Sequence, residues 1–224
     1  MDLLEIQSKW IDKFYEMQKA DRKGLLAAPF LSVPGEPGSS TQFGSILLVG
    51  KATAGPWCLD KFLSGASQSL EQQVENRRDV TKRHLGFMKD LQPSAFWRFW
   101  KALSAISSPV IWTNLAKIGV VHGNPSGAYL SAQQDLACET LRAEICEYNP
   151  SLVVIAGDFA KNQIVFPAFG VPRSEWHEPT EEFCWLDRTA SRPAVLWTNH
   201  PERKPRARIR CWLEMAQKLV TETH

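Results

Sequence analysis

The residues best suited to chemistry in this 224-residue chain follow an apolar run near its end. The run Val195-Leu196-Trp197-Thr198 leads into Asn199-His200-Pro201, which places an imidazole where a buried strand is expected to end. Ligands of open α/β sheets bind at such strand ends. Five cations follow: Arg203, Lys204, Arg206, Arg208 and Arg210. Because clustered cations bind phosphates, the segment predicts a nucleic-acid site beside a reactive histidine.

Three earlier apolar runs also end in small or polar residues. The run at 45–50 leads into Lys51-Ala52-Thr53, the run at 109–114 ends in Asn114, and the run at 152–157 ends in Gly157. Continuous apolar runs of this length are typical of strands buried on both faces of a parallel sheet. The carboxyl ends of parallel strands share one edge, so we expect these residues to gather near His200.

Helical patterning separates the runs and sets the fold class. Amphipathic or capped helices are expected at 3–22, 67–91, 94–106, 131–148, 158–166 and 205–220. Right-handed crossovers then give an α/β fold, a three-layer α/β/α sandwich with a four-stranded, mostly parallel sheet. We expect a single domain over residues 1–224, with a helix and loop at 1–40 and the core at 45–220.

Composition excludes several classes of protein. Hydrophobic residues make up 44% and charged residues 22%, and no apolar run approaches the about 20 residues of a membrane helix. The five cysteines include no Cys-x-x-Cys pair, which argues against a disulfide framework or a zinc ribbon. We therefore expect a cytoplasmic, monomeric protein that has no membrane contact, no metal and no cofactor.

The ordered set of strand ends resembles the uracil-DNA glycosylase superfamily. Members of that family have a Gly-x-x-Pro-Gly-like loop after the first strand, an asparagine after the second and His-Pro-Ser or a variant after the fourth. Here the corresponding segments are 50–57, Ile111-Trp112-Thr113-Asn114 and His200-Pro201, and the segment 150–160 is also similar. The resemblance covers residues 45 to 215 and implies a glycosylase-like core.

The resemblance also implies roles for individual residues. Asn114 would read the edge of a flipped base, and His200 would stabilise the base as it leaves as an anion. Trp57, with Phe62 as its rival, would stack on the extruded base. Each residue has a simpler explanation: Asn114 would close a turn, His200 would bond to backbone, and the aromatic residues would belong to the core.

The first loop departs from the family pattern. Lys51, Ala52 and Thr53 occupy the positions where most members carry an acid or amide that orients the attacking water. Asp60 is the nearest substitute, and the Lys51 amine is an alternative nucleophile. Small residues from Ala52 onward leave room that uracil-restricted members fill with a bulky aromatic residue. The resemblance therefore predicts removal of a damaged or C5-modified pyrimidine from DNA, as in defence against phage.

Three other functions remain open at this point. A non-catalytic nucleic-acid-binding protein of the same fold would explain the missing acid. A uracil repair glycosylase would use the same site on an unmodified base. A small-molecule nucleotide enzyme is disfavoured because no Gly-rich phosphate motif is present. A second cationic cluster, Arg77, Arg78, Lys82 and Arg83, is expected to be a solvated helix face.

Overall fold

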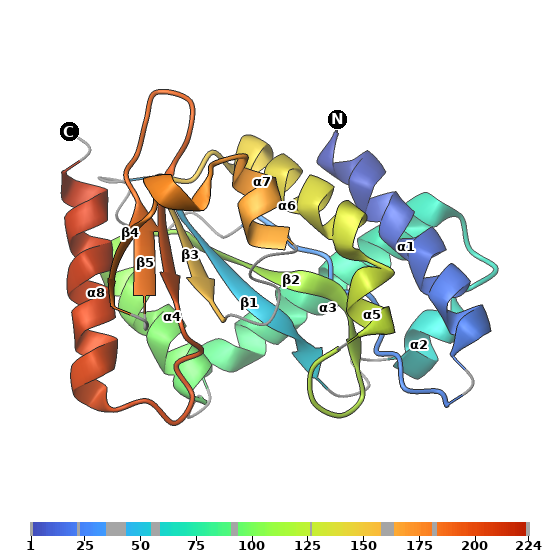
Figure 1. The fold of residues 1–224 in the computed structure, drawn as a ribbon. Helices are drawn as coiled ribbons and strands as arrows, with labels where there is room; N and C mark the ends of the chain where they lie inside the picture. Colours follow the sequence, from blue (N-terminus) through green and yellow to red (C-terminus); the bar gives the residue numbers. More distant parts are fainter. Residues whose placement is uncertain are drawn as a thin grey trace.

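A mixed six-stranded sheet lies at the centre of the computed structural model (Figure 1). The structure describes residues 2–21, 23–34, 44–54, 59–90, 94–125, 127–157, 164–180 and 183–222. The strand order is β2-β1-β3-β6-β5-β4. Within these ranges, no helix combines the length and apolarity needed to cross a bilayer.

The four predicted strands are present and run parallel to one another. They are β1 (Ile46–Ala54), β2 (Val110–Val120), β3 (Leu152–Ala156) and β6 (Ala194–Thr198). Their buried residues point alternately into the two faces of the sheet.

The predicted count of four strands is wrong. Two short strands, β4 (His177–Thr180) and β5 (Phe183–Leu186), extend the sheet beyond β6 in antiparallel orientation. β5 is apolar but only four residues long, and its side chains alternate between half-buried and buried. β4, at the edge of the sheet, begins with the exposed His177 and Glu178, so this pair gives a weaker sequence signal than the central strands.

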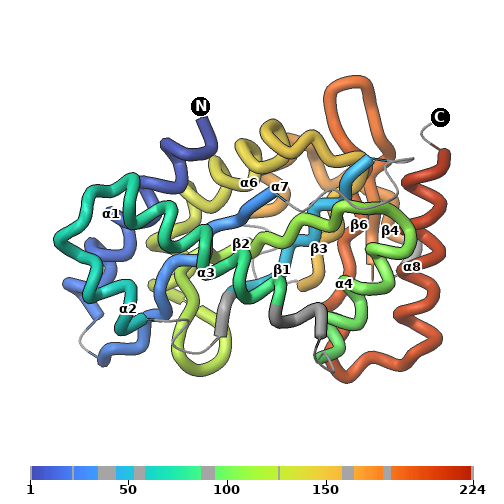
Figure 2. Tube along the Cα trace, turned by 180° about the vertical axis from the view of Figure 1, so that it is seen from behind, coloured from blue at the N-terminus to red at the C-terminus, as the bar shows by residue number. Residues whose placement is uncertain are grey.

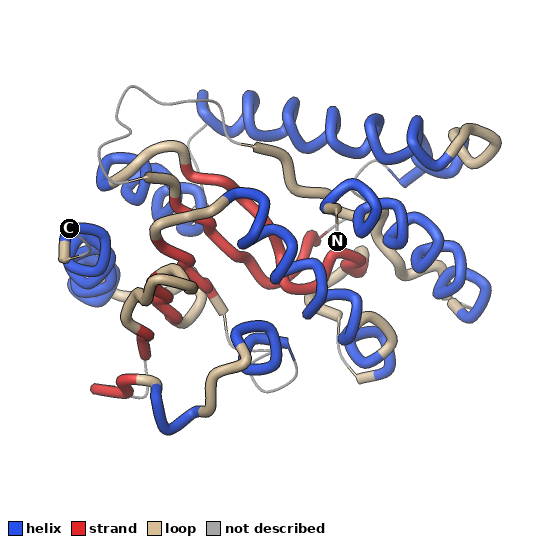
Figure 3. Tube along the Cα trace, turned by 90° about the horizontal axis from the view of Figure 1, so that it is seen from above, coloured by secondary structure: helices blue, strands red, loops and turns tan. Residues whose placement is uncertain are grey.

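Helices cover both faces of the sheet (Figure 3), which confirms an α/β fold with a helical layer on each side. One face packs against α1 (Leu3–Ala20), α6 (Gln134–Tyr148) and α7 (Phe166–Phe169). The other packs against α4 (Ala95–Ile106) and α8 (Arg206–Thr221). Shorter pieces are α2 (Leu59–Ser64), α5 (Ala128–Ser131) and the 3-10 turn Arg173–Glu175. The predicted helix at 158–166 lies mostly outside the described residues.

The N-terminal region is part of the core. Residues 26–33 are all buried, and Ala27 and Phe30 donate backbone hydrogen bonds to the carbonyls of Gly119 and Lys117 on the free edge of β2. Helix α3 (Leu70–Asp90) contacts this segment, and the hydroxyl of Thr81 on α3 donates a hydrogen bond to the Leu31 carbonyl at 2.8 Å. The extended segment therefore closes the β2 edge of the sheet, which the predicted helix and loop at 1–40 did not include.

The prediction of a solvated cationic face on α3 is wrong for Arg77. Its side chain is 2% exposed, its Nε donates to the Pro29 carbonyl at 2.8 Å, and its guanidinium lies 5.6 Å from the centre of the Phe62 ring. Lys82 remains at the surface, where it pairs with Glu75 and Asp79. The cluster is thus divided between the core and the surface.

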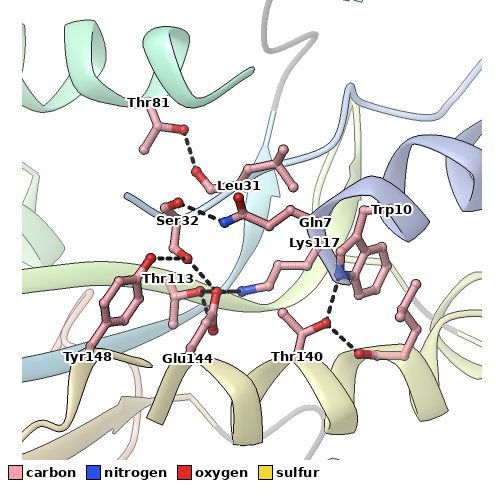
Figure 4. Close-up of polar contacts among 11 residues, drawn as sticks. Gln7, Trp10, Leu31, Ser32, Thr81, Thr113, Lys117, Thr140, Glu144 and Tyr148 are labelled. Carbon is pink, nitrogen blue, oxygen red and sulfur yellow. Dashed lines mark hydrogen bonds and ion pairs between the residues drawn. The ribbon is translucent and has the colours of Figure 1, made fainter. Parts of the chain in front are cut away.

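A buried polar network joins β2 to α6 and the N-terminal segment (Figure 4). Lys117 Nζ lies 2.6 Å from a carboxylate oxygen of Glu144, and both side chains are almost fully buried. The same carboxylate accepts hydrogen bonds from Thr113 at 2.8 Å and from Ser32 at 2.6 Å. A buried carboxylate needs such partners to offset its desolvation, so β2 is held tightly on this side of the sheet.

Candidate functional site

A cavity of about 660 Å³ opens at the carboxyl ends of β1 and β6. The helices α3 and α4, which lie in front of the sheet in Figure 2, both contribute lining residues. Its walls come from β1, β2, the loop after β2, the loop between β6 and α8, and one side each of α3 and α4. The volume falls in the range of ligand pockets, roughly 300–1,000 Å³. Asn114 and His200 both line it, so the structure brings the two predicted site residues together.

Asn114 enters the cavity from inside a strand. The prediction that it follows a strand end is wrong, because β2 continues to Val120. Asn114 is paired in register with Gly50 on β1, and its side chain is 3% exposed. A Cβ on Gly50 would lie closer than 3.0 Å to the Asn114 side-chain oxygen. Gly50 therefore leaves the space that the amide occupies.

The Asn114 amide has unmet hydrogen-bonding capacity. Its Nδ2 is buried and finds no hydrogen-bond partner among the described residues. A buried donor without an acceptor costs about 1–3 kcal/mol. A ligand that supplies an acceptor in the cavity would recover that cost. Asn114 lies inside β2, so it does not close a turn.

His200 is half-buried and held in one orientation. Its ring stacks on Phe96, with centroids 5.8 Å apart and 10° between the planes. The backbone N–H of Glu202 donates to Nδ1 at 3.3 Å, which leaves the proton of the neutral ring on Nε2. Burial, and then the positive charge of Lys51, lower the pKa of His200 below its ordinary value. The neutral ring is thus an Nε2–H donor at neutral pH.

Lys51 lies where the chain order of the sheet reverses. From β1 the chain passes first to β2 on one side and later to β3 on the other, so the switch point lies between β1 and β3. A Cβ on Gly157, just after β3, would lie 2.5 Å from Cγ and 2.7 Å from Cε of Lys51. The bare Gly157 backbone, with φ of +148°, thus gives the lysine stem its path into the cavity.

An aromatic wall completes the cavity, and sequence reasoning missed it. It consists of Phe96 and Trp97 on α4, Trp112 on β2 and His84 on α3. Trp97 and Trp112 meet edge to face at 4.9 Å, and the His84 ring lies 5.8 Å from Trp112. Burial lowers the pKa of His84. The alternation of a strand places Trp112 on the same face as Asn114, a signal that identifies Trp112 in advance.

The cationic segment borders the cavity only in part. Arg203 and Lys204 line it, and Arg203 has a left-handed backbone with φ of 58° in the turn that Lys204 N–H closes on the Pro201 carbonyl. Arg206, Arg208 and Arg210 belong to the first turns of α8. At 100° per residue, Arg206 and Arg210 share a helix face and Arg208 points away from it. The five cations therefore do not form one surface.

Of the other predicted residues, one lines the cavity and two lie elsewhere. Ala52 lines the cavity with Gly50 and Lys51, as predicted. Phe62 is a correction: it is 5% exposed and packs on Phe14 and Tyr15 in the core, because α2 turns it inward. Asp60 is exposed on α2 and does not line the cavity, so it is also misplaced for activating water there.

Two predicted residues lie wholly or partly outside the described part of the chain. Trp57 lies outside the described residues, and only the backbone of Thr53 is described, within β1. The described part of the chain brings together no group of three or more His, Cys, Asp or Glu side chains suited to a metal.

Comparison with models of known protein families gives no match for this chain, and comparison with curated protein sequences also gives none.

The cavity is positively charged on balance. Lys51, Arg203 and Lys204 line it, whereas Glu202 is the one carboxylate among the described lining residues. A neutral donor on His200, an unpaired amide on Asn114 and an aromatic wall lie between these cations. The arrangement suits a flat heteroaromatic group attached to a phosphate chain.

Proposed function

We propose that the protein is a DNA glycosylase-like enzyme that flips a damaged or C5-modified pyrimidine into this cavity and hydrolyses its N-glycosidic bond. The observation that carries the proposal is the position of Asn114 and His200 on one cavity, with cations at its rim. A flipped base needs recognition of its edge, and its departure needs a hydrogen-bond donor.

The two side chains suit different steps. The Asn114 amide recognises the base, because its buried Nδ2 lacks an acceptor among the described residues. His200 donates from Nε2 to a base oxygen as negative charge develops there. A donor that strengthens in this way typically contributes ~10²- to 10³-fold in rate. The half-buried His200 ring is neutral because burial lowers its pKa, so it has already lost part of its hydration before a base binds.

The size of the cavity favours a substituted base. Ala52 presents only a methyl group to the cavity, and the aromatic residues of α3, α4 and β2 also line it. A pyrimidine alone leaves much of about 660 Å³ unfilled, and an unfilled apolar wall contributes no dispersion energy. A hydroxymethyl or glycosyl substituent at carbon 5 would use this space.

One observation favours binding without catalysis. Glu202 is the one carboxylate among the described lining residues, and it is exposed in the loop after His200. A protein that grips an extruded nucleotide and does not cleave it would need the cavity and the cations but no water-activating group. This alternative is separated from the first by product analysis.

The test is base release from duplexes that carry uracil, hydroxymethylcytosine or glucosylated hydroxymethylcytosine, measured by mass spectrometry and by alkali-induced strand scission. We expect release of a modified base, and a loss of ~10²- to 10³-fold in His200→Ala. His177→Ala is the matched control, because His177 is exposed and pairs with Asp187 on the far edge of the sheet.

Each unfavourable result has a defined meaning. Undiminished release in His200→Ala would remove the imidazole from the reaction. Release of uracil alone would refute the preference for modified bases. Tight binding with no release from any duplex would establish the binding protein instead.

A further inference from the structure

We propose that Lys51 is a nucleophile that gives the protein a second activity, cleavage of the DNA strand at an abasic site through a covalent imine. This inference rests on the proposed function, because it needs an extruded nucleotide in the same cavity. It adds a lyase reaction to base removal and explains why a lysine occupies the first-loop position at which an acid or amide was expected.

The position of Lys51 supports the assignment. The residue is half-buried on β1, next to Gly50, which pairs in register with Asn114. Its methylene stem crosses the backbone of Gly157, where any side chain would collide with it. A lysine that points into solvent would not need this space beside Gly157. The space lets the Lys51 stem lie at the switch point of the sheet, where the ligand is expected.

The surroundings of the amine also fit. Lys51 and His200 both line the same cavity, and the positive charge of Lys51 contributes to the lowered pKa of His200. Glu202 follows His200 by two residues and is the one carboxylate among the described lining residues. The site thus offers an amine that can form an imine and a carboxylate that can accept a proton.

The reaction balances without any further reagent. Lys51 first loses a proton to water, and the nitrogen lone pair attacks C1′ of an abasic deoxyribose in its aldehyde form. The carbonyl oxygen takes up protons and leaves as water, which forms a protonated imine between Nζ and C1′. No oxidant or reductant takes part in this step.

Strand cleavage follows by elimination. Glu202 accepts a proton from C2′, the C2′–H electron pair forms a C2′–C3′ double bond, and the C3′–O bond breaks. The 3′ phosphate leaves as the 5′ end of the downstream strand. Water then hydrolyses the conjugated imine, which releases the unsaturated aldehyde and restores the Lys51 amine.

The experiment uses the full chain and a duplex with a preformed abasic site, so it does not depend on base removal. Sodium borohydride reduces the imine to a stable amine, and the product is a protein–DNA adduct visible on a denaturing gel. We expect an adduct with the unmodified protein, strand cleavage without alkali, and loss of both in Lys51→Arg, which keeps the charge. Peptide mapping of the adduct should identify Lys51.

Control variants separate nucleophile from structure. Lys61→Arg should trap as well as the unmodified protein, because Lys61 is exposed on α2 outside the cavity. Gly157→Ala should reduce trapping while Lys51 is still present, because the added methyl group obstructs the lysine stem. Thermal unfolding of each variant shows whether it is folded.

The outcomes distinguish this proposal from the proposed function. No adduct with the unmodified protein, or an undiminished adduct in Lys51→Arg, would overturn the lyase assignment. An adduct mapped to Lys204 would overturn it as well. Base release without trapping would leave the glycosylase standing alone, and trapping on abasic DNA without base release would leave the lyase standing alone.

Discussion

Replacement of Gly50 by alanine tests the geometry of the cavity most directly. The added Cβ would lie closer than 3.0 Å to the side-chain oxygen of Asn114, 3.4 Å from Trp112 Nε1 and 3.5 Å from the Phe96 ring. All three neighbours line the cavity, and Asn114 is 3% exposed, so the amide cannot move into solvent. Overpacking of this kind costs about 1–3 kcal/mol of stability.

The effect on recognition is calculated separately. An amide pushed out of position loses the two hydrogen bonds that it would make to a base, each worth about 0.5–1.5 kcal/mol. The combined loss of about 1–3 kcal/mol corresponds to a decrease of roughly 5- to 150-fold in kcat/KM. The stability loss and the activity loss therefore have similar size and need separate measurements.

Urea denaturation measures the stability, and base release under single-turnover conditions measures the activity. Gly86→Ala on α3 is the matched control, because a Cβ there meets nothing within 4 Å. It should stabilise the helix by about 0.5–1 kcal/mol and leave activity unchanged. If Gly50→Ala retained both stability and activity, the close contact between β1 and the Asn114 amide would not exist in solution.

Three further predictions concern the core, the histidines and the cations. Lys117→Met should cost about 3–5 kcal/mol in urea denaturation because Glu144 stays buried and charged, and the double variant Lys117→Met/Glu144→Leu should recover most of that loss. Burial lowers the pKa of His200 and His84 below 6.5. The unfolded chain therefore binds more protons just below pH 6.5, and the free energy of unfolding should rise with pH there and level off above it, with a smaller slope in His84→Gln. Binding to duplex DNA should weaken as salt is added, with a slope of log K against log salt concentration of about −2.7 for three neutralised phosphates. Binding that does not change with salt would exclude contacts between these cations and the phosphates.

Much of the central sheet could be predicted from sequence because its strands are buried on both faces. Four continuous apolar runs located β1, β2, β3 and β6, and His200 follows the end of β6 as expected. Asn114 lines the same cavity as His200, but from inside β2 and not from a strand end. The extent of β2 could not be predicted, since Lys117 interrupts the apolar run. Its partner Glu144 lies 27 residues away on α6, and only tertiary structure reveals that the charge is paired.

The helix residues that line the cavity were harder to predict than the strand residues that line it. Phe96 and Trp97 fit an ordinary apolar helix face, and nothing local distinguishes aromatic residues that face a ligand from those that face a core. Phe62 shows the opposite error, because proximity in sequence to the first loop suggested a site residue where α2 makes a core residue. The strands β4 and β5 were missed because each has only four residues, and β4 begins with the exposed His177 and Glu178.

Adjacent residues of β2 serve opposite sides of the sheet. Thr113 donates to the buried Glu144 carboxylate, and the next residue, Asn114, faces the cavity. The backbone of Asn114 is therefore held by a network on the other side of the sheet from the cavity. It loses little conformational freedom when a ligand binds in the cavity. The part of the site formed by β2 therefore tolerates little change. New ligand preferences should arise by substitution of the side chains on α3 and α4, while the residues of β2 stay the same.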